Sequence, residues 1–263
     1  MSDSPTVSAG RARDARPRSG GEWGWADMHI HSLYSDGTAS VRQILDHIER
    51  HTELDVAAIT DHERIDGALR AADLHAAGDY SFDLVVGEEV TTRQGHVVAL
   101  FITERIPALR PIEETLHRIH AQGGIAIAAH PMAPVPLSLG RRSLRRVRDH
   151  EHEDVYLDAI ELFNPSYAGR VRQGARLALN AAELGLPGVG NSDAHVLAGI
   201  GTGFTAFRGS TAQEYRRAIE AGEVAAEGSH WSSVHNVDVY RRQLHAKLRH
   251  LWHTLKPGDE DWR

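Results

Sequence analysis

Two histidines near the N-terminus are spaced so that a β-strand would point both imidazoles in the same direction. In the stretch ADMHIHSLYSDG, His29 and His31 are separated by one apolar residue, and alternate residues of a strand lie on the same face. Asp193 and His195 have the same spacing in GNSDAH, with a carboxylate in place of one imidazole. Imidazoles and carboxylates together suit zinc, manganese and iron ions and require no thiolate. The two pairs therefore indicate a site for divalent metal ions.

Further imidazoles and carboxylates recur at the same end of successive predicted strands. An isolated histidine at a strand end is usually a satisfied polar residue, and it is this recurrence that favours a metal site. A carboxylate can bridge two cations, and two metal ions about 3.5–4 Å apart activate water and hold phosphoryl oxygens. The further candidate ligands are Asp36, His62, Glu89, His96 and His130. The histidines on predicted helices, which we interpret as surface residues, are His47, His51, His75, His117 and His120.

Short apolar runs alternate with amphipathic helical patterns, and these elements must position the candidate ligands. The alternation predicts an α/β fold with a mostly parallel sheet, and about seven strand–helix units indicate a barrel. The active site of a (β/α) barrel forms at the carboxyl ends of its strands. The predicted strands are 27–31, 56–60, 83–90, 95–102, 125–130, 158–163, 188–195 and 201–207, with a short one near Val224. The predicted helices are 40–51, 67–78, 111–124, 141–156, 168–185 and 212–222.

The overall composition excludes several classes of protein. The 263-residue chain has a net charge of −7, which argues against a protein devoted to nucleic acid because phosphate binding requires a basic surface. It contains no cysteine, so disulfides and thiolate metal sites are excluded. No apolar run approaches the length of a membrane span, and the N-terminus lacks the apolar segment of a secretory signal. We therefore expect a cytoplasmic protein with no membrane partner.

The two ends of the chain differ from its centre. Residues 1–22 are rich in Ser, Pro, Gly and Arg without periodicity, which predicts a disordered leader. We expect the barrel to occupy residues 23–230, followed by a C-terminal helical extension over residues 231–263. Within this extension, residues 239–255 place apolar side chains on one helical face. We expect this helix to pack on the barrel, and a partner-binding helix is the alternative.

Six motifs in a fixed order resemble those of the PHP family, named for the polymerase and histidinol phosphatase domain. The motifs are DMHIHSLYSDG, AITDHERIDG, VGEEVTT, GHVVAL, IAAHP and GNSDAH. The likeness extends from about Asp27 to Phe207. It implies a distorted seven-stranded, TIM-like (β/α) barrel that binds two or three divalent ions of manganese, iron or zinc. It also implies, for most members, the hydrolysis of phosphoesters.

The resemblance implies three groups of metal ligands, two of which share Glu89 as a bridge. The family spacing G-x-E places this role on Glu89 and not on Glu88, because Gly87 precedes them. All nine ligand positions are filled, which favours an active enzyme over a fold that has lost its ligands. The three groups are His29, His31, Glu89 and Asp193; then Glu89, His96 and His130; and then Asp36, His62 and His195.

The chain departs from the family pattern in two places. Many members carry an aspartate directly after TDH, where this chain has Glu63, and we do not expect Glu63 to be a ligand. Many phosphatase members also carry a helical insertion before AHP. Only 33 residues separate His96 from His130, so no such lid fits here. We expect an open pocket, or one covered by the loop at 132–143.

A phosphorylated substrate requires cations and hydrogen-bond donors in addition to metal ions. Arg141 and Arg142 follow the AHP motif and are candidates for binding a phosphate through paired N–H groups. The alternative is that the arginine run at 141–148 is a solvated basic face. Asn164 ends a predicted strand and is a candidate to line the pocket, or else to form the turn before Pro165.

These observations predict the hydrolysis of a small phosphomonoester or nucleotide by a hydroxide that bridges two or three metal ions. Asp193 would be essential, and His195 or His62 would protonate the leaving oxygen if the third ion is absent. One alternative is a 3'-5' exonuclease or phosphodiesterase acting on nucleic acid, which the acidic net charge disfavours. Another is a non-catalytic scaffold domain held together by metal ions, which the complete ligand set disfavours. A hydrolase of C–N or C–O bonds with the same metal ions is a further alternative.

Overall fold

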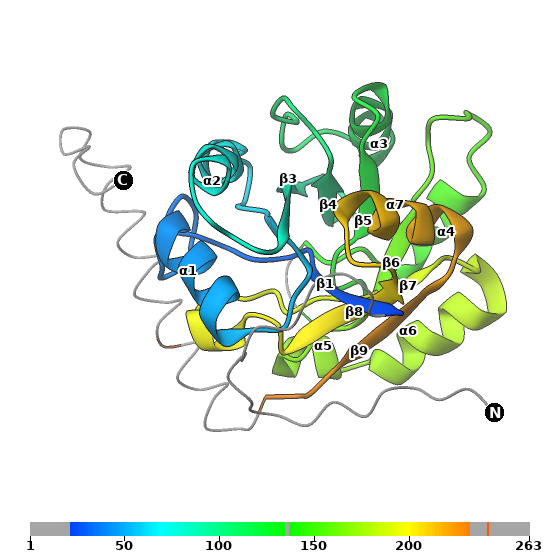
Figure 1. Ribbon diagram of the computed structural model, residues 1–263. Helices are drawn as coiled ribbons and strands as arrows, with labels where there is room; N and C mark the ends of the chain where they lie inside the picture. The colour runs from blue at the N-terminus through cyan, green and yellow to red at the C-terminus, as the bar shows by residue number, and fades with distance from the viewer. Residues whose placement is uncertain (1–21, 135–136, 232–240, 242–263) are drawn as a thin grey trace.

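The computed structural model describes residues 22–134, 137–231 and 241, and its strands form one curved sheet that nearly closes into a barrel (Figure 1). The strand order is β7-β6-β5-β4-β3-β2-β1-β8-β9, so the predicted barrel is present with nine strands and not seven. The strands are β1 (Trp23–Asp27), β2 (Val56–Ile59), β3 (Asp83–Thr91), β4 (His96–Leu100), β5 (Ile125–Ala128), β6 (Ala159–Phe163), β7 (Gly188–Gly190), β8 (Gly203–Arg208) and β9 (Val224–Gly228).

The helices lie on the outside of the sheet (Figure 1). Helices α1 and α2 pack against one part of it, and α3 and α4 pack against another. The α-helices are α1 (Val41–His51), α2 (Asp66–Ala76), α3 (Ile112–Ala121), α4 (Arg141–Arg148), α5 (Tyr167–Arg170), α6 (Gln173–Leu179) and α7 (Ala212–Ala221). Two short helices of other types are η1 (Asn180–Leu184), a π-helix, and η2 (Leu197–Gly199), a 3₁₀-helix. None of the helices in the described residues has the length and hydropathy needed to cross a membrane.

The sheet is mixed, which corrects the prediction of a mostly parallel one. Four neighbouring pairs are parallel and four are antiparallel. Strand β4 runs antiparallel to both of its neighbours, β3 and β5. Because β4 is reversed, its first residue, His96, pairs with Thr91 at the end of β3. The start of β4 and the ends of the parallel strands therefore meet at the same end of the barrel.

Two isolated bridges tie together the segments that follow the strands. Ile30 pairs in parallel with Ala194, and His62 pairs in parallel with Glu89. The first bridge is closed by hydrogen bonds from the His31 amide to the Ala194 carbonyl and from the Ala194 amide to the His29 carbonyl, at 2.9 and 3.2 Å. The segment after β1 is thus held against the segment after β7.

Apolar side chains fill both faces of the short strands. All four residues of β2 and all four residues of β5 are buried, as expected for strands covered on both sides. Helix α1 shows how the local sequence fixes an element. Ser40 and Gln43 form a reciprocal capping box at its start, and one face buries Val41, Ile44, Leu45 and Ile48. These contacts fix the wall of the barrel beside the candidate ligands.

Several predicted boundaries were wrong. The strand expected at 27–31 ends at Asp27, because only the Ile30 bridge continues the pairing. The helix expected at 168–185 is broken at Arg172, whose φ of 62° lies in the left-handed region, so α5, α6 and η1 replace it. The helix expected at 141–156 ends at Arg148. The predicted leader, apart from Glu22, and the predicted C-terminal helix at 239–255, apart from Arg241, lie outside the described residues.

Candidate metal centre

All nine predicted ligands converge at the end of the barrel where β3 finishes and β4 begins. They form four overlapping groups, and the donor atoms of each group lie within 4.8 Å of one another. This division differs from the three groups that the resemblance implies, because three histidines as well as Glu89 each belong to two groups. The groups are His31, Asp36, His62 and His195; His29, His31 and Asp193; His29, Glu89 and His130; and His62, Glu89 and His96.

The carboxylate of Glu89 lies between two sets of imidazoles. Its Oε1 is 2.9 Å from His96 Nδ1 and 3.1 Å from His130 Nε2. Its Oε2 is 3.2 Å from His29 Nε2 and 3.1 Å from His62 Nδ1. Although burial opposes ionisation, the neighbouring imidazoles, His62 foremost, hold the pKa of Glu89 well below its usual range. A carboxylate whose two oxygens face separate nitrogen donors has the arrangement needed to bridge two cations.

The buried donor atoms of this cluster are better arranged to bind a metal ion than to form hydrogen bonds with one another. His29 Nε2 and Glu89 Oε2 are both buried, yet neither makes a hydrogen bond of acceptable geometry within the described residues. Burying a polar atom without a partner is costly, and a cation between these two atoms would satisfy both. The donors are imidazole nitrogens and carboxylate oxygens, a set that suits zinc, manganese and iron. The residues present therefore fit divalent metal ions.

A second carboxylate, that of Asp36, lies close to the imidazoles of His31, His62 and His195. Its Oδ1 lies 3.1 Å from His195 Nε2 and 3.8 Å from both His62 Nε2 and His31 Nδ1. Burial disfavours the charged form of His195, but Asp36 outweighs it and raises the pKa of His195 to about 9. Burial and the charge of His195 lower the pKa of His31 to about 3. His31 is therefore a neutral imidazole, the form that binds a metal ion.

Two of the candidate ligands have strained backbone conformations. Asp193 has a φ of 51° and His130 a φ of 27°, in the region that non-glycine residues rarely adopt. Asp193 Oδ1 lies 3.3 Å from His31 Nε2, and its other oxygen accepts a 3.4 Å hydrogen bond from Asn164 Nδ2. Strain of this kind clusters at functional sites. The predicted pocket residue Asn164 is thus a buried neighbour of Asp193.

The sequence analysis missed Glu161, which orients two of the candidate ligands. Its Oε1 accepts hydrogen bonds from His29 Nδ1 at 2.8 Å and from Asn191 Nδ2 at 2.9 Å. Its Oε2 accepts a 2.7 Å bond from the backbone amide of His130. A carboxylate behind a ligating histidine fixes the ring and its tautomer. The sequence did carry a signal for Glu161, which is the single acid inside the apolar strand AIELF. An acid in such a strand would be buried, and a buried charge requires partners.

Two further buried aspartates hold the loops that carry the ligands, and the sequence analysis missed both. Asp61 accepts hydrogen bonds from the Ser32 amide at 2.7 Å and from the Ser32 and Ser35 hydroxyls at 2.6 Å, which fixes the loop before Asp36. Asp27 accepts bonds from the Ser192 amide at 3.0 Å and the Gly201 amide at 2.9 Å, which fixes the loop around Asp193. Burial raises the pKa of Asp27 to about 6.

Glu63 supports the neighbouring strand and belongs to none of the four groups within the described residues. Its carboxylate accepts hydrogen bonds from the Thr91 hydroxyl and, at 3.2 Å, from the Thr91 amide. Its own amide donates to the carbonyl of Glu89 at 3.0 Å. This glutamate therefore anchors the end of β3, and the expectation that it is not a ligand stays a prediction.

The arginine run lies on the surface in helix α4. Arg141 and Arg142 are exposed at the start of this helix. Arg145 forms a two-pronged ion pair with Glu183, at 2.6 and 2.7 Å, and Arg146 pairs with Glu113. These ion pairs favour the alternative interpretation, in which most of the arginine run at 141–148 is a solvated basic face. Phosphate binding by Arg141 and Arg142 remains a prediction.

Comparisons with known proteins place the chain among PHP proteins. A family model described as "PHP-associated" matches residues 176–224. An uncharacterized protein of Methanocaldococcus jannaschii is 35% identical over 150 residues, which cover 53% of this chain and 81% of the relative.

Solved structures share the fold. A two-domain protein of Bacteroides vulgatus containing a predicted PHP-like metal-dependent phosphoesterase matches with a TM-score of 0.60 and 20% identity, over 85% of this chain and 70% of its own. An amidohydrolase of Chromobacterium violaceum, solved with bound sulfate and no metal, matches with a TM-score of 0.54 and 18% identity, over 76% of this chain and 97% of its own. Together with the six motifs and the arrangement of the nine residues, these matches show that the chain belongs to the PHP domain family.

Proposed function

We propose that this protein is a metal-dependent phosphoesterase that hydrolyses a small phosphomonoester or nucleotide. The observation that carries the proposal is the position of Glu89, whose two oxygens face separate sets of histidines. The nine residues would hold two or three divalent ions, with Glu89 shared between them. Such ions, when bound, supply an activated water molecule and neutralise charge on phosphoryl oxygens.

The side chains around the centre have separable roles in this proposal. Asp193 would bind an ion through Oδ1, while Asn164 holds Oδ2. His195 is held 3.1 Å from Asp36 and would keep a proton available for the leaving oxygen if no ion occupies its group. His62, which is partly exposed at the edge of the cluster, is the second candidate for that role.

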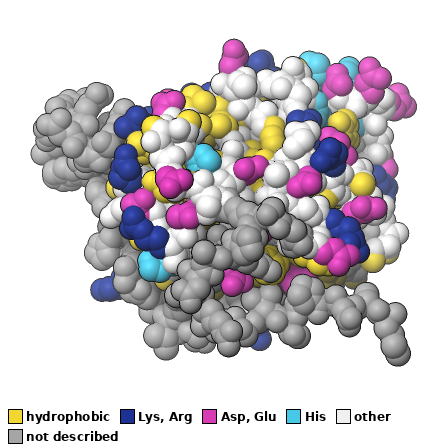
Figure 2. Space-filling model, in the orientation of Figure 1, with side chains coloured by type: hydrophobic (Ala, Val, Ile, Leu, Met, Phe, Trp, Pro, Cys, Tyr) yellow, Lys and Arg dark blue, Asp and Glu magenta, His cyan; other side chains and the backbone are white. Residues whose placement is uncertain are grey.

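The net charge of −7 disfavours a nucleic-acid substrate. On the face shown in Figure 2, basic and acidic side chains are interspersed, and the basic ones form no continuous patch among the described residues. Binding to a nucleic-acid backbone requires several phosphates to be neutralised together. We therefore favour a small phosphorylated substrate over a polynucleotide.

The test is phosphate release from a panel of phosphomonoesters and nucleotides, using protein loaded with Mn²⁺ and counted for bound metal. We expect release that a chelator abolishes and that Asp193→Asn lowers by about 100-fold or more. Asp149→Asn, which removes an exposed carboxylate paired with Arg148, is the control and should leave the rate unchanged.

The other outcomes identify the alternatives. Bound metal without phosphate release, but with cleavage of a single-stranded oligonucleotide, would favour the phosphodiesterase. Cleavage of an amide in a parallel panel would favour a C–N hydrolase, and bound metal without any turnover would favour a scaffold. Full phosphate release by Asp193→Asn would contradict the assignment of the centre.

A further inference from the structure

A second group of metal-ligand side chains lies outside the nine-residue centre. It consists of His117 on α3, with His152 and Asp154 on the connection between α4 and β6, and its donor atoms lie within 4.8 Å of one another. Asp154 Oδ2 is 3.4 Å from His117 Nδ1 and 4.0 Å from His152 Nδ1. The two rings meet edge-on, with centroids 5.8 Å apart. The sequence analysis interpreted His117 as a surface residue, and it is indeed about half exposed.

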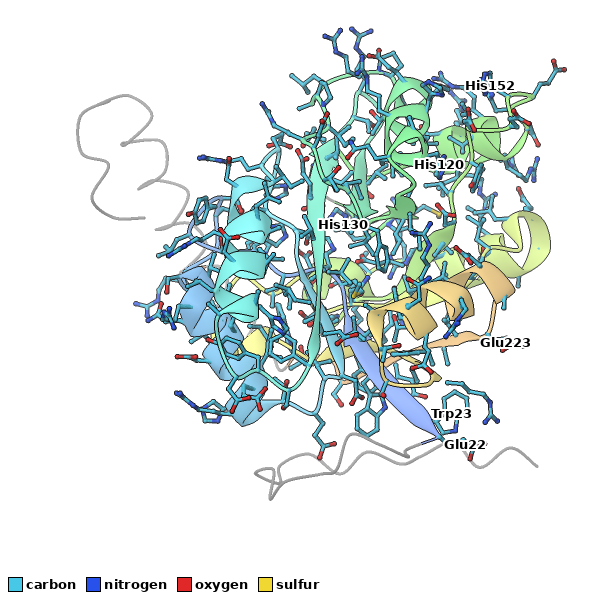
Figure 3. All side chains as sticks on the ribbon, turned by 45° about the horizontal axis from the view of Figure 1, so that its top comes forward. Glu22, Trp23, His120, His130, His152 and Glu223 are labelled. Atoms are coloured by element: carbon cyan, nitrogen blue, oxygen red, sulfur yellow. The ribbon has the colours of Figure 1, made fainter. Side chains whose placement is uncertain are left out.

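This group lies at the end of the barrel opposite the nine-residue centre. Helix α3 leads into the start of β5, and the connection carrying His152 leads into the start of β6. The centre instead uses His130, which follows the end of β5, and Asn164, which follows the end of β6. Figure 3 shows His152 on the outside of the molecule and His130 in its interior. The two groups are therefore separate.

Contacts within the protein already hold the second group in place. His120, one turn beyond His117 on α3, uses Nδ1 to bond the Asp154 carbonyl at 2.8 Å and Nε2 to bond Asp158 Oδ2 at 3.0 Å. Its ring also stacks on Tyr156, with centroids 4.1 Å apart. The connection is thus packed against α3, and the three donors face one another before any ligand arrives.

We propose that His117, His152 and Asp154 bind one late first-row divalent metal ion, such as Zn²⁺. Two imidazoles and one carboxylate, with water in the remaining position, match the ligands of three-residue zinc sites. The three side chains are 53, 56 and 44% exposed, so an ion reaches them directly from solvent. The ion would join α3 to the connection before β6, so its binding should stabilise the contact between these two segments.

The test is the binding of Zn²⁺ to the full-length protein after its centre has been loaded with metal. The wild type should bind one more zinc ion per chain than His152→Ala or Asp154→Asn. Zinc at a hundredfold excess over its Kd at this site should raise the Tm of the wild type by about 5–10 °C relative to these variants. The rate of the centre's own reaction should be the same in all of them, which separates this site from the proposed function.

The matched control is His47→Ala, which removes the partly buried member of a histidine pair on another helix. His47 and His51 lie on α1, with ring centroids 5.0 Å apart. This variant should keep the additional zinc ion and the increase in Tm. Equal zinc content in the wild type and His152→Ala, or loss of the ion in His47→Ala, would overturn the proposal.

Discussion

The imidazole of His29 and the carboxylate of Glu161 form a fully buried hydrogen bond, with Nδ1 2.8 Å from Oε1. Because Nδ1 donates its proton to Glu161, the ring nitrogen of His29 left for a metal ion is Nε2, which faces Glu89 at 3.2 Å. The other oxygen of Glu161 fixes the backbone of His130. One carboxylate thus sets the orientation of two candidate ligands that are far apart in the sequence.

Replacing Glu161 with Gln should weaken metal binding by about 10–100-fold. A Gln side chain can accept the bond from His29, but its amide group would then face the amide of His130, and two donors repel. The affinity is measured by dialysis against buffered Mn²⁺ or Zn²⁺, and saturating metal should restore activity. Glu183→Gln, which alters surface ion pairs with Arg145 and Arg148 away from the centre, is the control. An unchanged affinity in Glu161→Gln would show that the ring of His29 is oriented by other contacts.

Replacing Arg176 with Met should destabilise the fold by about 2–4 kcal/mol, because two buried carbonyls lose their donors. Arg176 is fully buried, and it donates to the carbonyl of Pro131 at 3.2 Å and to that of Gly169. Urea denaturation measures the loss. Arg145→Met should have a much smaller effect, since its ion pair with Glu183 lies at the surface. A loss in Arg176→Met no larger than in this control would contradict the prediction.

Replacing Gly37 with Ala should displace the loop that carries Asp36. A Cβ at this position would lie 2.6 Å from the carbonyl carbon of His31 and 2.8 Å from the amide nitrogen of Ser32. These are backbone atoms, so the loop itself must move, and we expect lower metal content and a lower Tm. Gly174→Ala is the matched control, because a Cβ there meets nothing within 4 Å among the described residues. That control should be neutral or slightly stabilising, since Gly174 is helical.

The contribution of Glu214 to stability should depend on pH. Hydrogen bonds from the Ser210 amide, the Thr211 hydroxyl and the Thr211 amide lower the pKa of Glu214 from its ordinary value of 4.5. A carboxyl with a lowered pKa stabilises the fold above its unfolded value and loses this effect as the pH falls through its folded value. The wild type should therefore be more stable than Glu214→Ala at pH 7, and the difference should shrink at about pH 3. Urea denaturation at both values checks this, and a difference that grows on acidification would refute it.

Local signals made several helices predictable. The capping residue Ser40 and the apolar spacing that follows it placed α1 to within one residue. Strand direction was not predictable in this way, because it depends on which strands become neighbours. The reversal of β4 was therefore missed, although His96 was correctly placed among the converging residues.

The candidate ligands could be predicted because they lie in short motifs at the ends of elements. Glu161 could not be found in the same way, because its role depends on the packing of β6 beside β5 and on His29 lying opposite it. The break at Arg172 was also invisible, since the helical periodicity continues through it. A left-handed backbone at a non-glycine residue such as Arg172 persists only where the surrounding structure imposes it.

The bridge between Ile30 and Ala194 has a consequence for when the candidate metal centre is assembled. Beside it, the amide of Met28 bonds the side chain of Asn191, and these partners are 163 residues apart in the chain. At about 5–20 residues per second, a ribosome needs roughly 8–30 s to synthesise that interval. His29 and His31 are therefore synthesised well before Asp193, which is added only when most of the barrel has been made. The two groups that contain Asp193 or His195 are therefore completed only after most of the barrel has been synthesised, whereas the groups of His62, Glu89 and His96 and of His29, Glu89 and His130 are complete earlier.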